Sequence, residues 1–491
     1  MRTQAYLIHR SVLTLFAAGT GLLCATTSFA QPLGNPGDPV VRYDGHKLVR
    51  VQVDTIRDVR TMESLSDDMW SHSIRDNQAE YRVTPEQFVV LQESGLTFEV
   101  LIDNLQTTVD EENARILASM QQGQALDGVT FYEEFRNEAA IMARISSLVN
   151  SRPDLATLWT FGQTIEGRDM TAVSIRRDLP SVPGCRPLVF INGVQHAREW
   201  ISPMCVTYFI DQLITNADTD PRIDALLNEV EFVFVPVSNP DGFDYTWTTE
   251  RFWRKNRRNN GNGTFGVDLN RNWAFQWGLS LPHSSAGNAN PNSNVYWGTA
   301  PFSEPETTAM SNLMMQYPNL RASIDVHSYG PLLLYPWAYT STPSPDNQAF
   351  VNLAVGMRNA ILAVHSMPYT PGPWYSALYP SSGTSQDWSY ANRGAWGFTI
   401  ELRGPSFAPP PTEILPCAEE TFEAVLLYAE STGQEFQFIA DWNHDCEYTI
   451  FDYIAFGTDY AAGNPECDLD GNGTLNVFDY IEFGNLYSQR R

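Results

Sequence analysis

Nearly continuous apolar runs between residues 130 and 434 restrict the fold of this chain more than any other feature of its sequence. They lie at 172–177, 187–193, 230–238, 322–328, 332–337 and 397–403, and a helix is expected before them at 135–150. Strands that are apolar along their whole length are buried on both faces, as in a parallel sheet packed between layers of helices. We therefore predict an α/β fold with a mixed, mostly parallel sheet covered by helices on both faces, in which ligands bind at the carboxyl ends of the strands.

The composition allows a large core and excludes one class of partner. The chain has 491 residues, of which 43% are hydrophobic and 12% aromatic, so two or three folded units are expected. Its formal net charge is -26. A nucleic-acid partner is not expected, because a phosphate backbone must be met by clustered Lys and Arg side chains.

The segment 1–30 has the pattern of an export signal. Arg2 and Arg10 form its basic end, and an apolar stretch at 12–24 leads to Gln31, where the mature chain would begin. This stretch is too short for a membrane span, and no later segment has that pattern. We expect a protein secreted to the extracellular space, the periplasm or the cell surface. The cysteines left after removal of the signal are odd in number, so at least one stays unpaired or pairs between chains: Cys185, Cys205, Cys417, Cys446 and Cys467.

The region before residue 128 is interpreted as a separate small α+β unit. Strand-like runs at 47–53 and 97–102 flank a helical pattern at 84–94, and no catalytic cluster occurs there. Residues 113–127 are polar and suit a helical or flexible connector that a processing protease could cut. The expected boundaries are 1–30 for the signal, 31–127 for the N-terminal unit and its connector, 128–434 for the α/β domain and 435–491 for a C-terminal repeat module.

Two histidines and two glutamates follow or end the predicted strands. His196 and Glu199 come directly after the run at 187–193, and Pro203 with an amphipathic run opens a helix behind them. His327 and Glu401 lie at the ends of two later runs. Two imidazoles and one carboxylate are a usual ligand set for catalytic zinc, and a second carboxylate facing the metal would serve as a general base. A lone HxxE is weak evidence, and the alternatives are a core histidine at His327 and an ion pair between Glu401 and Arg403.

Five motifs in the same order resemble those of the zinc carboxypeptidases of the carboxypeptidase A/B type. The motifs are HAREW at 196–200, RFWRKNRR at 251–258, DLNRNW at 268–273, HSYGPLLLYPW at 327–337 and DWSYANRGAWGFTIELR at 387–403. The resemblance implies that His196, Glu199 and His327 bind one catalytic zinc ion. It also implies that Glu401 is the general base and that Arg254 stabilises the tetrahedral oxyanion.

The same resemblance assigns the substrate-binding residues. Asn270 and Arg271 would grip the terminal carboxylate of a peptide, Tyr379 would close over it, and Arg198 would be an auxiliary cation on the substrate's route. A planar guanidinium binds a carboxylate in bidentate fashion, which explains why an exopeptidase would result. Gln386 takes the position that sets the charge at the base of the side-chain pocket. Because it is neutral, we expect a preference for neutral or aromatic C-terminal residues, with the pocket lined further by Leu334, Ala338, Trp374, Ser381 and Thr399.

The segment 39–112 resembles the activation peptide that precedes the enzyme in this family. The hypothesis is that it covers the cleft as an inhibitor and folding aid until the chain is cut between about 113 and 128. Two other functions stay open at this stage: an amidase of the same fold that acts on peptidoglycan stem peptides or acyl-amino acids, and a catalytically inactive protein that keeps zinc for structure. The presence of Asn270, Arg271 and Tyr379 counts against the first, and that of Glu401 and Arg254 against the second.

The last fifty residues contain a repeat with a period of 27, in which 450–460 returns as 477–487. Each copy follows an acidic loop whose oxygen-bearing residues have the offsets 1, 3, 5, 9 and 12 of a calcium loop. These residues are Asp441, Asn443, Asp445, Thr449 and Asp452 in the first copy and Asp468, Asp470, Asn472, Asn476 and Asp479 in the second. Gly473 occupies the sharp-turn position of the second loop, whereas Cys446 does so in the first and could instead bridge to Cys467.

The tandem repeat resembles a dockerin module, a small helical calcium-loop domain. That resemblance implies two structural calcium ions and a scaffold or cell-surface receptor as partner. The alternative is an acidic disordered tail, in which the repeated apolar residues would have no use.

Overall fold

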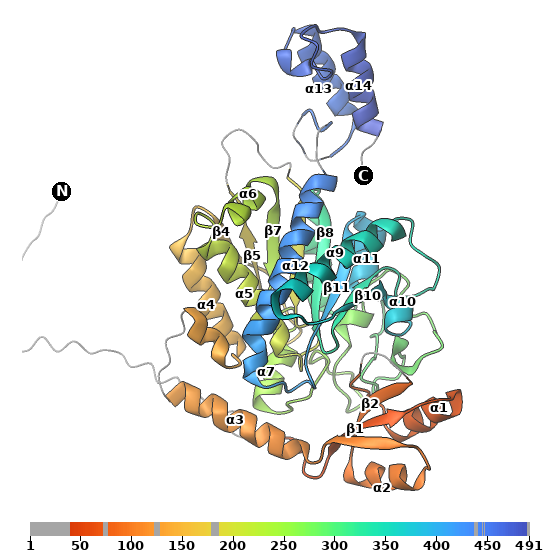
Figure 1. Ribbon diagram of the computed structural model, residues 1–491. Coiled ribbons are helices and arrows are strands. Elements are labelled where there is room, and N and C mark those ends of the chain that lie inside the picture. The colour runs from red at the N-terminus through yellow and green to blue at the C-terminus, as the bar shows by residue number, and fades with distance from the viewer. Residues whose placement is uncertain are drawn as a thin grey trace, which may run out of the picture.

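The computed structural model describes residues 40–71, 77–121, 128–177, 186–436 and 440–488, the last range without 444 and 446. The predicted signal at 1–30, Cys185 and Cys446 lie outside the described residues. Figure 1 shows a large α/β body with a small unit of strands and helices at one side and a pair of helices beyond the end of α12. No helix in the described ranges is long and apolar enough to cross a membrane.

The large unit is built on a mixed eight-stranded sheet of order β10-β9-β11-β8-β6-β7-β5-β4. The parallel pairs are β6 with β7, β6 with β8, β8 with β11 and β9 with β10, and the other pairs are antiparallel. The strands are β4 (Ala156–Gln163), β5 (Asp169–Ile175), β6 (Leu188–Gly193), β7 (Glu231–Val235), β8 (Leu320–Ser328), β9 (Leu332–Tyr335), β10 (Thr370–Pro373) and β11 (Trp396–Leu402). The predicted α/β class is confirmed; β4 and β10 were missed because neither is an apolar run.

Helices cover both faces of this sheet, and β6 shows why its sequence is apolar throughout. Val189 and Ile191 pack into one core cluster with α5, while Leu188 and Phe190 pack into a second cluster on the opposite face with α8. Successive side chains of a strand point to opposite faces, so a strand between two helical layers is buried at every position. The helices of this unit are α4 (Glu138–Ser151), α5 (Ile201–Thr215), α6 (Pro221–Glu229), α7 (Pro240–Thr248), α8 (Pro305–Met315), α9 (Asn347–His365), α10 (Trp374–Ala377), α11 (Ser385–Arg393) and α12 (Ile414–Glu435). Short 3₁₀ turns lie at η1 (Gly128–Glu133), η2 (Leu269–Arg271), η3 (Ser284–Ala286) and η4 (Pro411–Glu413).

The N-terminal unit is a three-stranded antiparallel sheet of order β2-β1-β3 with two helices and a connecting helix. Its elements are β1 (Lys47–Gln52), α1 (Ile56–Leu65), β2 (Gln78–Val83), α2 (Pro85–Glu93), β3 (Phe98–Ile102) and α3 (Leu105–Gln121). The helices α1 and α2 both begin with a capping box, in which a threonine side chain and the third helical residue satisfy each other's backbone amides. The connector predicted at 113–127 is helical as far as residue 121.

The C-terminal unit pairs two helices from the two copies of the repeat. They are α13 (Ile450–Ala461) and α14 (Val477–Ser488), with a 3₁₀ turn η5 (Pro465–Cys467) between them. Phe456 and Phe483, which are equivalent in the repeat, stack with ring centroids 4.3 Å apart in the centre of its small core. The repeated apolar residues therefore have a structural use, which argues against a disordered tail.

Candidate active site

The predicted metal ligands come together because three adjacent parallel strands end at the same edge of the sheet. β6 ends at Gly193 and is followed by the turn that carries His196 and Glu199, directly before α5. In the neighbouring strands, His327 near the end of β8 is paired in register with Glu401 near the end of β11. Gly193 is required where β6 turns, since a Cβ atom there would lie 2.7 Å from the side-chain oxygen of Ser202.

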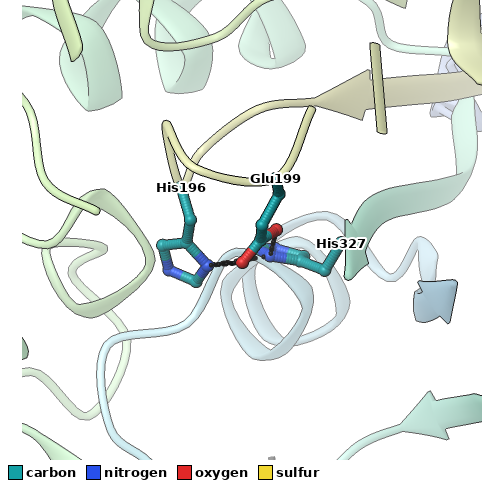
Figure 2. A group of neighbouring side chains, drawn as sticks. All are labelled: His196, Glu199 and His327. Atoms are coloured by element: carbon teal, nitrogen blue, oxygen red, sulfur yellow. Dashed lines mark hydrogen bonds and ion pairs between the residues drawn. The ribbon is translucent and has the colours of Figure 1, made fainter. Parts of the chain in front are cut away.

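The side chains of His196, Glu199 and His327 form one buried group, as Figure 2 shows. The two oxygens of Glu199 lie 2.9 Å from Nδ1 of His196 and 3.0 Å from Nδ1 of His327, and the two Nδ1 atoms are 3.0 Å apart. All these donor atoms lie within 4.8 Å of one another. Burial opposes the charge of Glu199, but the two imidazoles hold its pKa well below the usual value. A carboxylate and two facing imidazole nitrogens fit the ligand set of a catalytic zinc site, in which a fourth position is left for water.

Two further carboxylates lie behind the histidines. Asp268 Oδ1 is 3.1 Å from Nε2 of His196, and Asp325 Oδ2 is 2.7 Å from Nε2 of His327. These contacts place the ring proton of each histidine on Nε2 and leave the lone pair of Nδ1 for a metal. Neither residue was predicted from the sequence. A signal existed for Asp325, which lies two positions before His327 in a strand and therefore on the same face.

Asp268 also holds the predicted oxyanion-stabilising cation. Its Oδ2 accepts hydrogen bonds from Nε and Nη2 of Arg254 at 3.1 and 3.0 Å. Burial opposes the charge of Asp268, but Arg254, His196 and Arg271 outweigh burial and hold its pKa well below the usual value. Asp268 therefore fixes one metal ligand and Arg254 together.

Glu401 is buried beside this group. Burial is the main cause that raises its pKa to about 8; Glu199 and Asp325 act in the same direction, and His327 and Arg254 oppose them. The alternative that Glu401 pairs with Arg403 is not what the structure shows, because Arg403 forms its ion pairs with Glu413 at 3.0 Å and Glu420 at 3.4 Å. Glu401 is thus a carboxyl group poised to exchange a proton at the edge of the metal site.

The residues predicted to bind a terminal carboxylate lie together on the next loop. Asn270 and Arg271 belong to η2 and are fully buried. Nη2 of Arg271 is 3.3 Å from the hydroxyl oxygen of Tyr379, and Nδ2 of Asn270 is 3.2 Å from Nε2 of His327. A guanidinium, an amide and a hydroxyl, which together suit an anion, therefore adjoin the predicted metal ligands directly.

Arg198 is occupied by the N-terminal unit. Its Nη1 lies 2.8 Å from Oδ1 of Asp68, whose Oδ2 lies 2.5 Å from Nε of Arg82. Burial opposes the charge of Asp68, but Arg82 and Arg198 hold its pKa at about 2. A narrow cavity of ≈ 20 Å³, large enough for about one water molecule, remains between the two units, lined by Asp67, Asp68, Met69, Ser71, Arg198, Arg254, Ser285, Asn294, Val295 and Tyr379.

Gln386 lies buried at the start of α11. Its Oε1 accepts a hydrogen bond from the hydroxyl of Thr399 at 2.8 Å. The neighbouring acid, Asp387, accepts the backbone N–H of Ala338 at 3.1 and 2.9 Å, and burial raises its pKa to about 7. Three of the other predicted lining residues, Leu334, Ala338 and Trp374, pack together in one apolar cluster. Nε1 of Trp374 also donates a hydrogen bond to Oγ of Ser381 at 3.1 Å.

The two acidic loops of the C-terminal unit each gather three carboxylates. Oxygens of Asp441, Asp445 and Asp452 lie within 4.8 Å of one another, and so do those of Asp468, Asp470 and Asp479. The remaining predicted ligands shape the loops: Asn443 Nδ2 donates to Asp445 at 2.8 Å, Thr449 caps α13, Asn472 Nδ2 donates to Asp470 at 2.6 Å, and Asn476 N donates to Asp479 at 2.8 Å.

A buried His–Glu–His group that fits a metal ion, a facing carboxyl and side chains that suit an anion, all at the carboxyl edge of an α/β sheet, are typical of a metal-dependent peptidase that acts on chain ends. Residues 141–424 match the family model described as zinc carboxypeptidase, and residues 49–112 match the one described as carboxypeptidase activation peptide. The chain belongs to the zinc carboxypeptidase family. It is a metallocarboxypeptidase of the A/B type that hydrolyses C-terminal peptide bonds, with zinc as its catalytic cofactor.

Individual relatives agree with this assignment. Carboxypeptidase A1 of Mus musculus is 30% identical over 427 residues, which are 84% of this chain and 98% of that protein. Carboxypeptidase B of Astacus astacus is 36% identical over 296 residues, which are 59% of this chain and 94% of that protein. Among solved structures, carboxypeptidase A from Helicoverpa armigera superposes with a TM-score of 0.72 at 25% identity and covers 80% of this chain and 98% of that one.

Proposed function

We propose that this chain is a secreted carboxypeptidase proenzyme that, once trimmed, removes neutral or aromatic residues from peptide C-termini. The observation that most supports the exopeptidase role is the contact between Arg271 and Tyr379 beside the metal ligands. A cation and a hydroxyl that meet at 3.3 Å form a site for one carboxylate, and only a chain end carries one on its main chain.

In this proposal His196, Glu199 and His327 hold the zinc ion. When bound there, zinc supplies Lewis-acid chemistry, which lowers the pKa of water and polarises the scissile carbonyl. Arg271, with Asn270 and Tyr379, binds the terminal carboxylate and sets the position of the scissile bond.

The remaining steps belong to Glu401 and Arg254. Glu401 takes a proton from the attacking water and passes it to the leaving amine, a role for which its buried position suits it. Arg254, held in place by Asp268, is directed at the oxyanion that develops on the carbonyl and needs no reorganisation. We expect Glu401→Gln to lower kcat by about 10²–10⁴ with zinc content unchanged.

Three features support the preference for neutral or aromatic C-terminal residues. The base position is Gln386, its amide oxygen is bound by Thr399, and the adjacent Asp387 is engaged by backbone amides. The neutral Gln386 and the engaged Asp387 therefore offer no free carboxylate to a Lys or Arg side chain of the substrate. Leu334 and Trp374 supply apolar surface for an aromatic or aliphatic side chain.

The N-terminal unit is proposed to inhibit the enzyme until the chain is cut between about 113 and 128. The pairing of Arg198 with Asp68 supports this role, since a cation on the substrate's route is then neutralised from within the chain. The proposed units are the N-terminal unit with its connector at 31–127, the catalytic domain at 128–434 and the C-terminal repeat module at 435–491. The segment 1–30 is proposed to direct export.

The C-terminal unit is proposed to bind two calcium ions and a scaffold or cell-surface receptor. Its two carboxylate groups support the first part. The second part is supported by equivalent apolar residues that stay exposed at the start of both helices, Ile450 (64%) and Phe451 (61%) in α13 and Val477 (63%) and Phe478 (64%) in α14.

The proposed activity is tested with hippuryl-type dipeptides that end in Phe, Leu, Gln, Lys or Glu, assayed before and after proteolytic trimming and with and without a zinc chelator. We expect chelator-sensitive hydrolysis after trimming, fastest for Phe or Leu. Fast hydrolysis of Lys substrates would overturn the specificity. Cleavage of acyl-amino acids or stem peptides in place of dipeptides would favour the amidase, and an inert zinc-loaded protein would favour the binding protein.

A further inference from the structure

One histidine outside the metal site lies against the proposed carboxylate clamp, which is formed by Asn270, Arg271 and Tyr379. The ring of His283 is parallel to that of Tyr379, with centroids 4.8 Å apart and an interplanar angle of 7°. This is the offset-stacked arrangement that aromatic pairs prefer. His283 stands in a polar loop with no motif around it, so no role could be predicted for it from the sequence.

The turn that begins at His283 also contacts Arg271, the cation of the clamp. Nδ1 of His283 accepts the backbone N–H of Ser285 at 3.1 Å, which fixes the first turn of η3. The carbonyl oxygen of Ser285 then accepts hydrogen bonds from Nε and Nη2 of Arg271 at 3.2 and 2.9 Å. The carbonyl oxygen of Ala286 accepts the backbone N–H of Ser382, three residues after Tyr379, at 3.0 Å.

The environment of His283 favours a neutral ring. Burial lowers its pKa, the charge of Arg271 lowers it further, and Glu63 opposes both. Because Nδ1 accepts a hydrogen bond, the ring proton of the neutral form lies on Nε2. A neutral imidazole can lie flat on a phenol ring without bringing a second positive charge against the guanidinium of Arg271.

We propose that His283 is a positioning residue of the carboxylate clamp, whose ring holds Tyr379 in place over Arg271. A tyrosine held there before substrate arrives does not have to be ordered when the peptide binds, so the substrate binds more tightly. This inference rests on the proposed roles of Arg271 and Tyr379 in substrate binding.

The position of Tyr379 should act on KM and leave kcat nearly unchanged. The clamp grips the terminal carboxylate equally in the bound substrate and in the transition state, and loss of such uniform binding raises KM alone. The contribution of one aromatic pair corresponds to a change of about 2- to 10-fold. A residue needed only for folding would not produce this split.

The test compares two substitutions in the zinc-loaded enzyme, which is produced as the full chain and then trimmed by proteolysis. His283→Asn keeps a side-chain oxygen that can accept the N–H of Ser285 and removes the stacking ring, so KM should rise about 2- to 10-fold with kcat within about 2-fold. His283→Phe keeps a ring against Tyr379 and should restore most of the wild-type KM. His365→Asn, at an exposed histidine paired with Glu419, is the matched control and should change neither constant.

A double-mutant cycle separates this inference from the function on which it rests. In a Tyr379→Ala background, His283→Asn should raise KM no further, since the ring that it positions is gone. An unchanged KM for His283→Asn in the otherwise wild-type enzyme, or the same rise in both backgrounds, overturns the role of His283. If Arg271→Ala also leaves KM unchanged, the proposed clamp itself fails.

Discussion

At the scale of single residues, the site depends on side chains that hold two functional groups at once, as Asp268 does. Asp268 accepts hydrogen bonds from His196 on one oxygen and from Arg254 on the other. Such a carboxylate orients the proposed metal ligand and the proposed oxyanion-stabilising cation at the same time. Its loss should therefore affect zinc affinity and turnover together.

We expect Asp268→Asn to weaken zinc binding and to lower kcat/KM, each by about 10- to 100-fold, because an amide can present only one acceptor oxygen to the two partners. Zinc affinity is measured by competition with a chromophoric chelator, and turnover is measured at saturating zinc. Asp244→Asn, on a half-exposed helix position, is the control. A variant with normal zinc affinity and normal turnover would contradict the assignment.

The raised pKa of Glu306, in the first turn of α8, implies a specific dependence of the protein's stability on pH. Burial raises its pKa to about 7, although the backbone N–H of Ile165 and the amide of Asn256 favour its charged form. A carboxyl group with a folded-state pKa above its unfolded value contributes stability below pH 4.5, and that contribution is lost as pH rises toward 7.

The Glu306→Gln variant should lack this loss. Between pH 5 and 8 the free energy of unfolding of the wild type, measured with urea at both values, should fall by about 1–3 kcal/mol relative to that of the variant. Parallel pH profiles for the two proteins would mean that Glu306 is ionised throughout.

At the scale of elements, the contact between the N-terminal unit and the large unit is built from buried ion pairs. Glu112 in α3 binds Arg251 through two hydrogen bonds, of 2.5 and 3.1 Å, and Asp68 binds Arg198. Trp70 packs against Phe252 and Phe407 beside these pairs. Removing one member of a buried pair leaves the other charge unpaired and costs more than the pair contributes.

Asp68→Ala should therefore weaken inhibition in the untrimmed protein. We expect its activity toward dipeptides to rise at least about tenfold over that of the untrimmed wild type, because the loss of a buried pair is commonly worth more than 1.4 kcal/mol. After trimming, the two proteins should be equally active. Asp67→Ala, next in the chain and lining the same cavity, is the control that should stay inhibited.

At the scale of the whole molecule, the proposed metals serve separate units. Zinc belongs to the large unit, and the acidic loops of the C-terminal unit lie beyond α12, where Figure 1 shows α13 and α14 apart from the sheet. Calcium bound to the folded loops alone would stabilise that unit by mass action and leave the chemistry unchanged.

Millimolar Ca²⁺ should therefore raise the thermal transition of the C-terminal unit, followed by circular dichroism, by several degrees, and EGTA should reverse the effect. Hydrolysis at fixed free zinc should not change. The double variant Asp452→Asn, Asp479→Asn should lose the calcium response. A calcium-independent transition in the wild type would leave these loops as acidic turns without an ion.

Features set by residues that are neighbours in the sequence could be predicted, whereas features set by residues far apart in the sequence could not. The buried strands could be predicted because their apolar pattern reports burial on both faces, as β6 shows. β10, with the sequence TPGP, is a strand only because it pairs with β9 at the edge of the sheet. Its own residues have low strand propensity, so no local pattern could indicate it.

The sequence alone determined which side chains could bind a metal and a carboxylate, since His196, Glu199, His327, Glu401 and Arg271 stand in motifs that local chemistry can interpret. Only the tertiary structure decided which groups stand behind them: Asp268 behind His196, Asp68 against Arg198, and His283 against Tyr379. The physical reason is that the members of these three pairs lie 72, 130 and 96 residues apart in the sequence, whereas hydrogen bonds and ring contacts require distances of a few ångströms in space. Such contacts arise when distant strands and loops pack together, and no periodicity in either partner encodes them.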